Sequence, residues 1–237
     1  MAAATNHFLI TCEHGGNRIP PSYRYLFRGH EELLQTHRGY DAGALPMARE
    51  LAKVLAAPLL VSTTSRLLID LNRSIGHPRL YSEASREATA ATRREILQRY
   101  YLPYRNKAEA DIAQAVAKGQ RVIHISSHSF TPQLNGEVRT ADIGLLYDPA
   151  RPGEVEICAR CQAFISALIP DMKVRRNYPY AGKADGLTAY LRHRFSADTY
   201  LGIELEINQK HVFQGGRRWR FLRGWVIEAL RRALAGG

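Results

Sequence analysis

The chain has 237 residues, of which 45% are hydrophobic and 23% charged, a balance typical of a soluble globular protein with a sizeable core. Its 33 Lys and Arg residues exceed its 22 Asp and Glu residues and give a net charge of +11, which raises the question of nucleic-acid binding. The sequence holds no nucleic-acid motif, and the basic residues are spread through predicted helices. A solvated basic surface, or a basic pocket for an anionic small molecule, is therefore the better interpretation.

The sequence contains none of the signals that would place it in or across a membrane. No apolar run approaches the roughly 18 residues that a bilayer span needs, and the N-terminus lacks a secretory pattern. Three cysteines do not make a disulfide framework, and the pair Cys158 and Cys161 has no second pair to complete a zinc site. We expect a cytoplasmic protein with a flexible start at residues 1–7; the sequence leaves open whether it forms a homo-oligomer.

Two apolar stretches each end in a histidine. The β-branched run from Val122 reads as a buried strand and leads into Ser126-Ser127-His128-Ser129, and the run 8–12 leads into Glu13-His14-Gly15-Gly16. Ligands collect at the carboxyl ends of strands in open α/β sheets. Two strands that deliver an imidazole at that edge predict a shared metal or a shared substrate.

A carboxylate stands where it could complete such a site. Apolar residues recur at three- and four-residue steps over 41–55, which predicts an amphipathic helix, and Asp41 lies at its start. Asp41 is thus either a helix cap or the oxygen ligand that joins two histidines, because a catalytic zinc uses three protein ligands.

The remaining elements alternate between strand and helix. We predict strands at 59–62, 67–73, 143–147, 173–175 and 200–209, and helices at 84–118 (interrupted near Pro103), 152–168, 188–193 and 217–235. Residues 133–139 are expected to be a flexible loop. This alternation predicts an α/β fold: one domain over residues 1–237, a three-layer αβα sandwich with a mixed, mostly parallel sheet.

Three further segments carry candidate site residues. Asn72 and Arg73 end the predicted third strand, where an amide beside a guanidinium is suited to holding a carboxylate. Glu204 and Glu206 lie two residues apart on the last strand and so share one face, where a carboxylate must be paired or functional. The polar loop 177–186 is predicted to form a pocket wall.

Four segments in this order carry a resemblance to a known family. They are Cys12 to Pro20, Ser65 to Arg73, Ser127 to Pro132, and Ile203 to Gln209. With them the sequence resembles the N-formylglutamate amidohydrolase family, from about Leu9 to Gln209. Its relatives by fold are the zinc carboxypeptidases, the aspartoacylase-like deacylases and the zinc-dependent N-acetylmuramoyl-alanine amidases.

The resemblance implies a phosphorylase/hydrolase-like αβα fold with a single divalent metal, zinc. It implies His14, Asp41 and His128 as metal ligands, Glu206 as general base, and Asn72 and Arg73 as the groups that hold the substrate α-carboxylate. Further pocket candidates are Arg139, Asn177 and Tyr180. The implied reaction is hydrolysis of the N-acyl bond of a small anionic amino acid, such as N-formyl-L-glutamate, to formate and glutamate.

The sequence departs from its relatives in ways that leave alternatives open. The carboxypeptidase pair His-x-x-Glu is missing after the first strand, so Glu13 competes with Asp41 as third ligand, and Glu204 competes with Glu206 as base. Arg105 stands where relatives often have a His, which leaves the substrate open. Other possibilities are a hydrolase of a different N-acyl or peptide substrate, a cysteine hydrolase using Cys12, a binding protein without metal, or a basic nucleic-acid binder.

Overall fold

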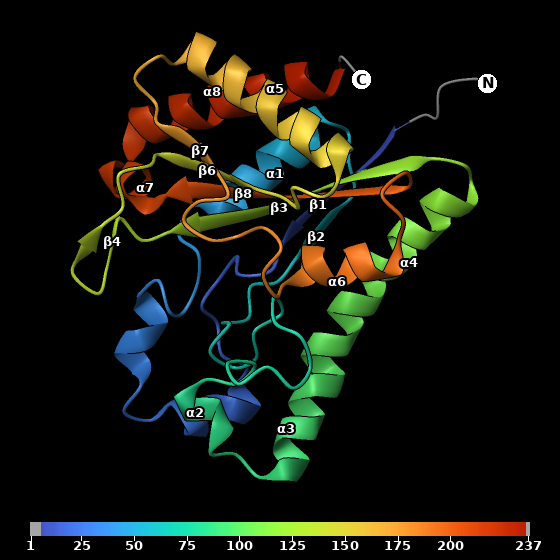
Figure 1. Ribbon diagram of the computed structural model, residues 1–237. Helices are drawn as coiled ribbons and strands as arrows, with labels where there is room; N and C mark the ends of the chain where they lie inside the picture. The colour runs from blue at the N-terminus through green and yellow to red at the C-terminus, as the bar shows by residue number, and fades with distance from the viewer. Residues whose placement is uncertain (1–5, 236–237) are drawn as a thin grey trace.

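A six-stranded sheet runs through the middle of the computed structural model, which describes residues 6–235 (Figure 1). Its strands are β1 (Asn6–Cys12), β2 (Leu59–Val61), β3 (Arg121–Phe130), β6 (Ile143–Leu146), β7 (Val174–Arg176) and β8 (Tyr200–Asn208). The order across the sheet is β2-β1-β3-β8-β6-β7. Neighbours pair in parallel except β6 and β8, which are antiparallel, so the prediction of a mixed, mostly parallel sheet is confirmed.

Helices cover both faces of this sheet. They are α1 (Ala44–Val54), α2 (Glu83–Arg86), α3 (Ala90–Ile96), α4 (Leu102–Ala117), α5 (Pro152–Leu168), α6 (Leu187–Arg194), α7 (Gln209–Gln214) and α8 (Gly216–Ala235). Figure 1 shows α1, α5 and α8 above the sheet, with α4, α6 and long loops below it. The predicted three-layer αβα sandwich is confirmed.

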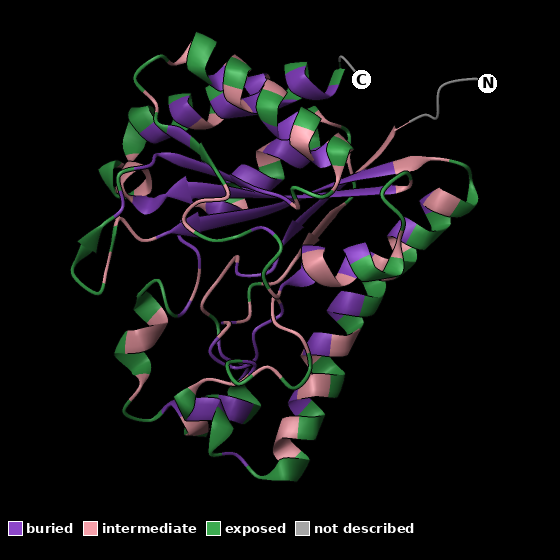
Figure 2. Ribbon diagram, viewed as in Figure 1, coloured by how far each residue is buried: buried purple, intermediate pink, exposed green. Residues whose placement is uncertain are grey.

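The two faces of the strands differ in polarity. Ile203, Leu205 and Ile207 of β8 belong to the apolar core beneath α1, α5 and α8. The alternating residues Glu204 and Glu206 therefore point to the opposite face, as the sequence predicts. Figure 2 shows the central strands β3 and β8 as almost continuously buried, so these carboxylates lie inside the molecule.

Residues 67–73 were predicted as a strand, and this is wrong. They form consecutive turns with local hydrogen bonds, such as Leu68 N to Ser65 O at 3.0 Å and Arg73 N to Asp70 O at 3.1 Å. Their leucines and Ile69 are buried in a second apolar cluster on the lower face of the sheet. A short apolar run does not by itself distinguish a strand from a buried turn segment.

Three other boundaries differ from expectation. Residues 133–139 contain a small hairpin of β4 (Gln133–Leu134) and β5 (Glu137–Val138) rather than only a loop. Asn6 and His7 belong to β1, so the expected flexible start is wrong for them, while residues 1–5 lie outside the described residues. The helix expected over 84–118 breaks after α2, then continues from α3 through a π-helical turn, η3 (Leu97–Tyr101), into α4.

Two short 3-10 helices, η1 (Pro21–Phe27) and η2 (Glu31–Gln35), lie in the lower layer.

Candidate active site

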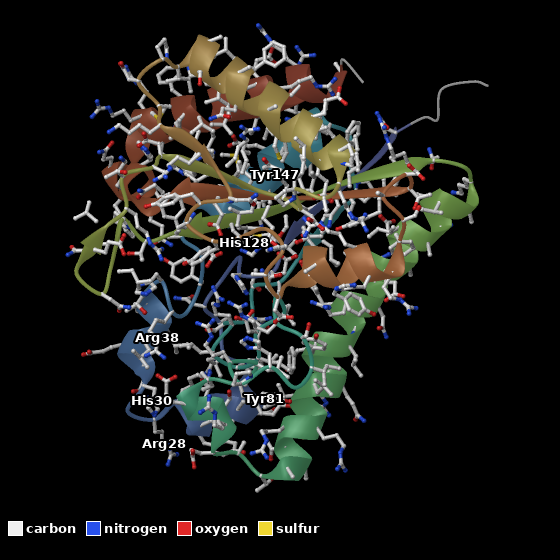
Figure 3. All side chains as sticks on the ribbon, viewed as in Figure 1. Arg28, His30, Arg38, Tyr81, His128 and Tyr147 are labelled. Atoms are coloured by element: carbon white, nitrogen blue, oxygen red, sulfur yellow. The ribbon has the colours of Figure 1, made fainter. Side chains whose placement is uncertain are left out.

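Two histidines meet at the carboxyl ends of neighbouring parallel strands. His14 follows β1, and His128 lies near the end of β3, which pairs with β1. Their ring centroids are 5.1 Å apart, and both side chains are buried. Figure 3 places His128 in the middle of the molecule, where the sheet meets the loops beneath it.

Asp41 joins the two rings. Its Oδ2 lies 2.8 Å from Nδ1 of His128 and 3.4 Å from Nδ1 of His14. The backbone also connects the segments, because Asp41 N donates to the carbonyl of His14 at 2.9 Å. Helix α1 is capped by Gly43 with a positive φ and without a side-chain cap, so the carboxylate of Asp41 faces the histidines and does not cap the helix.

The donor set fits a divalent metal. Among the described residues, His14, Asp41 and His128 offer one ligand atom each within 4.8 Å of one another. Two imidazoles and one carboxylate, with a position left for water, are the ligands of a catalytic zinc.

The outer nitrogens of both rings face buried carboxylates. Nε2 of His14 lies 2.7 Å from Oδ1 of Asp70, and Nε2 of His128 lies 3.0 Å from Oε2 of Glu13. A histidine that donates its outer N–H to a carboxylate keeps the lone pair of the other nitrogen for a metal. Glu13 thus lies behind His128 and outside the group of possible ligand atoms, which favours Asp41 over Glu13 as third ligand.

Charged partners hold the carboxylates of this group ionised. Burial opposes ionisation of Asp70, but Arg66 and His14 lower the pKa of its carboxyl well below the usual value. The pKa of Asp41 is likewise lowered, against burial, by His14, His128 and Arg66. The Arg66 guanidinium contacts both acids, at 3.3 Å from Asp41 and 2.7 Å from Asp70. A carboxyl group must be ionised to bind a metal or to orient an imidazole as an acceptor.

Glu206 is placed across from His128. The two residues are direct partners in the β3–β8 ladder, and Oε2 of Glu206 is buried with no hydrogen-bond partner among residues 6–235. The pKa of Glu206 is raised to about 8, mainly by burial and also by the charges of Asp41 and Glu204, while His128 opposes the rise. A buried carboxyl with a pKa near neutrality is suited to proton transfer.

Glu204 is already engaged. Its Oε1 accepts a hydrogen bond of 2.6 Å from the hydroxyl of Thr188 on α6. Because Glu206 lacks such a partner and lies directly opposite His128, the geometry favours Glu206 as the base.

Four of the five predicted substrate-binding residues form two pairs, and Asn177 has contacts of its own. Arg139 and Tyr180 lie together: Arg139 donates to the Tyr180 hydroxyl at 3.1 Å, and no ion pair of Arg139 occurs among the described residues. Asn72 instead accepts from Leu187 N, the first residue of α6, at 2.6 Å, and Arg73 donates to the carbonyl of Asp185 in the loop before α6 at 2.9 Å.

Asn177 and Arg105 also have structural contacts. Asn177 Oδ1 accepts from the backbone N–H groups of Tyr147 and Gly182, each at 3.0 Å, and so shapes its own loop. Arg105 is buried, lies over the ring of Tyr190 at 4.4 Å and donates to the carbonyl of Leu71.

Sequence reasoning missed several residues around His14, Asp41 and His128, called here the metal group because they could hold a metal ion. Tyr104 donates to Oε1 of Glu13 at 2.9 Å, and Ser126 donates to its Oε2 at 2.5 Å. The pairing of Asp70 with His14 was also missed, because Asp70 lies in a segment that was predicted to be a strand. Ser126 offers the one signal in the sequence, since it lies two residues before His128 and so shares its face.

The two glycines after His14 allow two chain segments to approach closely. A Cβ at Gly15 would lie 2.9 Å from the carbonyl of Ser62, and one at Gly16 2.7 Å from that of Thr63. Their smallness lets the chain after β1 run close to the chain after β2.

Comparison with known proteins identifies the family of the chain. The family model of N-formylglutamate amidohydrolase matches residues 6–213. The chain belongs to the N-formylglutamate amidohydrolase family.

Solved structures agree with the fold of this family member. A gene product from Agrobacterium tumefaciens shares 29% identity and superposes with a TM-score of 0.81, covering 98% of this chain and 92% of that one. The N-formylglutamate amidohydrolase from Ralstonia eutropha JMP134 shares 18% identity and has a TM-score of 0.70, covering 99% and 95%. No protein with a curated functional description matches the chain. Within residues 6–235, every helix is too short or too polar to cross a bilayer.

Proposed function

We propose that this protein hydrolyses the N-acyl bond of a small acidic amino acid, with N-formyl-L-glutamate as the first candidate. Water would cleave this substrate to formate and glutamate. The observation that carries the proposal is the arrangement of His14 and His128, whose Nδ1 atoms face Asp41 while their Nε2 atoms face Asp70 and Glu13.

His14, Asp41 and His128 would hold the metal, for which zinc is the first candidate. A bound divalent cation supplies Lewis acidity to the acyl carbonyl and makes water more acidic. Asp70 and Glu13 keep the two rings in the orientation that this binding needs, and Arg66 keeps Asp41 and Asp70 ionised.

Glu206 would act as general base and then as general acid. As carboxylate it takes a proton from the attacking water, and as carboxylic acid it returns that proton to the departing amine nitrogen. Its unpartnered Oε2 is available for both transfers.

Arg139 would bind a substrate carboxylate, since its guanidinium is held by Tyr180 and has no acidic partner among the described residues. Asn72 and Arg73 remain candidates for the α-carboxylate, because Asn72 uses its Oδ1 on Leu187 and keeps its Nδ2 group for a ligand. Fixing the carboxylates aligns the acyl carbon with the base.

The cysteine-hydrolase alternative finds no support. The Cys12 side chain belongs to the apolar core on the α1 side of the sheet, while Glu13 faces the site. Burial raises the pKa of the Cys12 thiol well above its usual value, so the reactive thiolate is disfavoured.

An activity panel tests the proposal. Protein freed of metal with a chelator would be assayed, before and after addition of zinc, manganese or cobalt, against N-formyl and N-acetyl derivatives of glutamate, aspartate, glutamine and alanine. The proposal expects metal-dependent turnover with the acidic derivatives preferred. Equal turnover with and without chelator, or turnover of peptides alone, would contradict it.

Three broader expectations stay predictions: that residues 1–237 form one domain, that the protein is cytoplasmic, and that it does not bind nucleic acid. A salt-dependent shift assay with DNA and RNA tests the last of them.

A further inference from the structure

The loop between β7 and α6 packs directly against β6, the strand that pairs with β8 beside Glu206. A Cβ on Gly144 of β6 would lie 2.0 Å from the carbonyl oxygen of Tyr178, so only glycine allows this approach. Gly144 is the ladder partner of Glu206. Residues 177–187, called here the wall loop, therefore form the side of the site next to the proposed base.

The first half of the wall loop is fastened to the sheet. Asn177 bonds the backbone of Tyr147 and Gly182, as described above, and the carbonyl of Gly182 accepts a hydrogen bond of 2.6 Å from Arg192. Arg192 also donates to the buried carboxylate of Glu154 and to the carbonyl of Gly202 on β8.

The second half is fastened to the segment that supports the metal group. The Asp185 carboxylate accepts a hydrogen bond from the backbone N–H of Ser74 at 3.1 Å and a short one from the Ser74 hydroxyl. Arg73 donates to the Asp185 carbonyl, and Asn72 Oδ1 accepts from Leu187 N. Three consecutive residues, 72–74, thus hold the wall loop at two positions, Asp185 and Leu187.

Residues 72–74 are in turn joined to His14 through Asp70. Oδ1 of Asp70 accepts from Asn72 N at 2.9 Å and lies 2.7 Å from Nε2 of His14. Arg73 N also donates to the Asp70 carbonyl. Hydrogen bonds therefore run from the Asp185 carbonyl through Arg73 to Asp70 and His14, and the Asp185 carboxylate binds Ser74, the residue next to Arg73.

We propose that Asp185 is a positioning residue that fixes the wall loop, and with it the substrate, relative to the metal-binding histidines. The proposal rests on the proposed hydrolase function, and it adds a residue that touches neither metal nor substrate. Catalysis is sensitive to such placement, because a displacement of about 1 Å can lower the rate about 100-fold.

A double-mutant cycle tests this role. Asp185→Ala removes both carboxylate contacts, Ser74→Ala removes the hydroxyl contact, and Asp185→Asn keeps one acceptor oxygen. Lys183→Ala is the matched control, because Lys183 is exposed in the same loop. Readouts are kcat and KM with N-formyl-L-glutamate, zinc affinity by chelator competition, protease cleavage within 177–187, and melting temperature.

We expect Asp185→Ala to lower kcat/KM by about 10-fold or more and Asp185→Asn to recover part of it. The double variant should lose no more than Asp185→Ala alone, since both changes remove one interaction. In Asp185→Ala, zinc affinity should fall by about threefold, because the segment that holds Asp70 against His14 is loosened. Protease should also cleave the wall loop faster than in the wild type. If Asp185→Ala does not fold, Asp185→Asn and Ser74→Ala carry the test.

Wild-type kcat/KM in a folded Asp185→Ala variant, additive losses in the cycle, or an equal loss in Lys183→Ala would overturn the proposal. A wild-type protein that hydrolyses no N-acyl amino acid would instead overturn the proposed function. In that case zinc affinity and protease cleavage still decide whether Asp185 holds the wall loop to the metal group.

Discussion

Asp70 lies between His14 and Arg66: its Oδ1 is 2.7 Å from Nε2 of His14, and its Oδ2 accepts hydrogen bonds from Arg66 at 2.7 and 3.2 Å. The carboxylate therefore orients a proposed metal ligand while its own charge is stabilised by a guanidinium. This arrangement makes Asp70 part of the proposed metal site, although Asp70 is outside the group of candidate ligands His14, Asp41 and His128.

Replacing Asp70 with Ala should weaken zinc binding about 10-fold to 100-fold, because His14 loses the partner that fixes its ring. Chelator competition measures the dissociation constant. Asp171→Ala, at an exposed position in the chain before β7, is the control and should bind zinc as the wild type does. An unchanged dissociation constant in Asp70→Ala would show that His14 needs no support.

Glu206→Gln should lower kcat by about 100-fold to 10,000-fold while the zinc content stays at the wild-type value, because the amide cannot take the proton of the attacking water. Glu204→Gln should have a much smaller effect, since the Thr188 hydroxyl still finds an acceptor oxygen in the amide. Rates and metal analysis on both variants check this. The opposite order would identify Glu204 as the base.

The stability of the metal-free protein should depend on pH through Glu206. Burial raises the pKa of this carboxyl from 4.5 to about 8, so between these values the folded protein binds more protons than the unfolded chain. The contribution of Glu206 to the free energy of unfolding is then fully present below pH 4.5 and is lost as the pH rises to about 8. Urea unfolding of metal-stripped wild type and Glu206→Gln should show a difference that grows over this range, with the Gln variant more stable at its upper end. A constant difference would mean that the carboxyl ionises as it does in water.

Arg139→Ala should raise KM for a substrate with a free carboxylate by about 10-fold or more, because a charge-assisted hydrogen bond is lost. The same change should matter less for a substrate whose carboxyl groups are amidated. Arg28→Ala is the control: this exposed residue lies at the end of the molecule remote from His128 (Figure 3). Equal effects on the free and amidated substrates would remove Arg139 from carboxylate binding.

Cys12→Ser should keep kcat close to the wild-type value and lower the melting temperature, because a polar hydroxyl replaces a buried thiol in the apolar core. Steady-state kinetics and thermal unfolding separate the two effects. Loss of turnover in a folded variant would revive a nucleophilic role for Cys12.

The sequence was most informative where local pattern and chemistry coincide. The histidines that end two apolar runs, and the glutamates spaced by two on β8, follow from strand periodicity alone, and the structure places them on neighbouring strands. Parallel pairing brings the carboxyl ends of β1 and β3 to one edge, which is why residues separated by more than a hundred positions could be predicted to meet.

The supporting residues could not be predicted in this way. Tyr104 reaches Glu13 from a helix on the lower face, and Asp70 reaches His14 from a run of turns whose apolar residues look like a strand. Such contacts depend on how layers pack, and packing leaves no periodic signal in one sequence. Asn72 and Arg73 show the same limit, since their contacts with 185–187 depend on the path of the wall loop.

The central claim is that His14, Asp41 and His128 together hold one divalent metal that hydrolysis requires. Elemental analysis and N-formyl-L-glutamate turnover, measured side by side on purified wild type and His128→Ala, test it most directly. The wild type should carry one zinc ion, or another divalent metal, per chain and release formate, and His128→Ala should have lost both. A folded His128→Ala protein that keeps its metal and its turnover would contradict the claim.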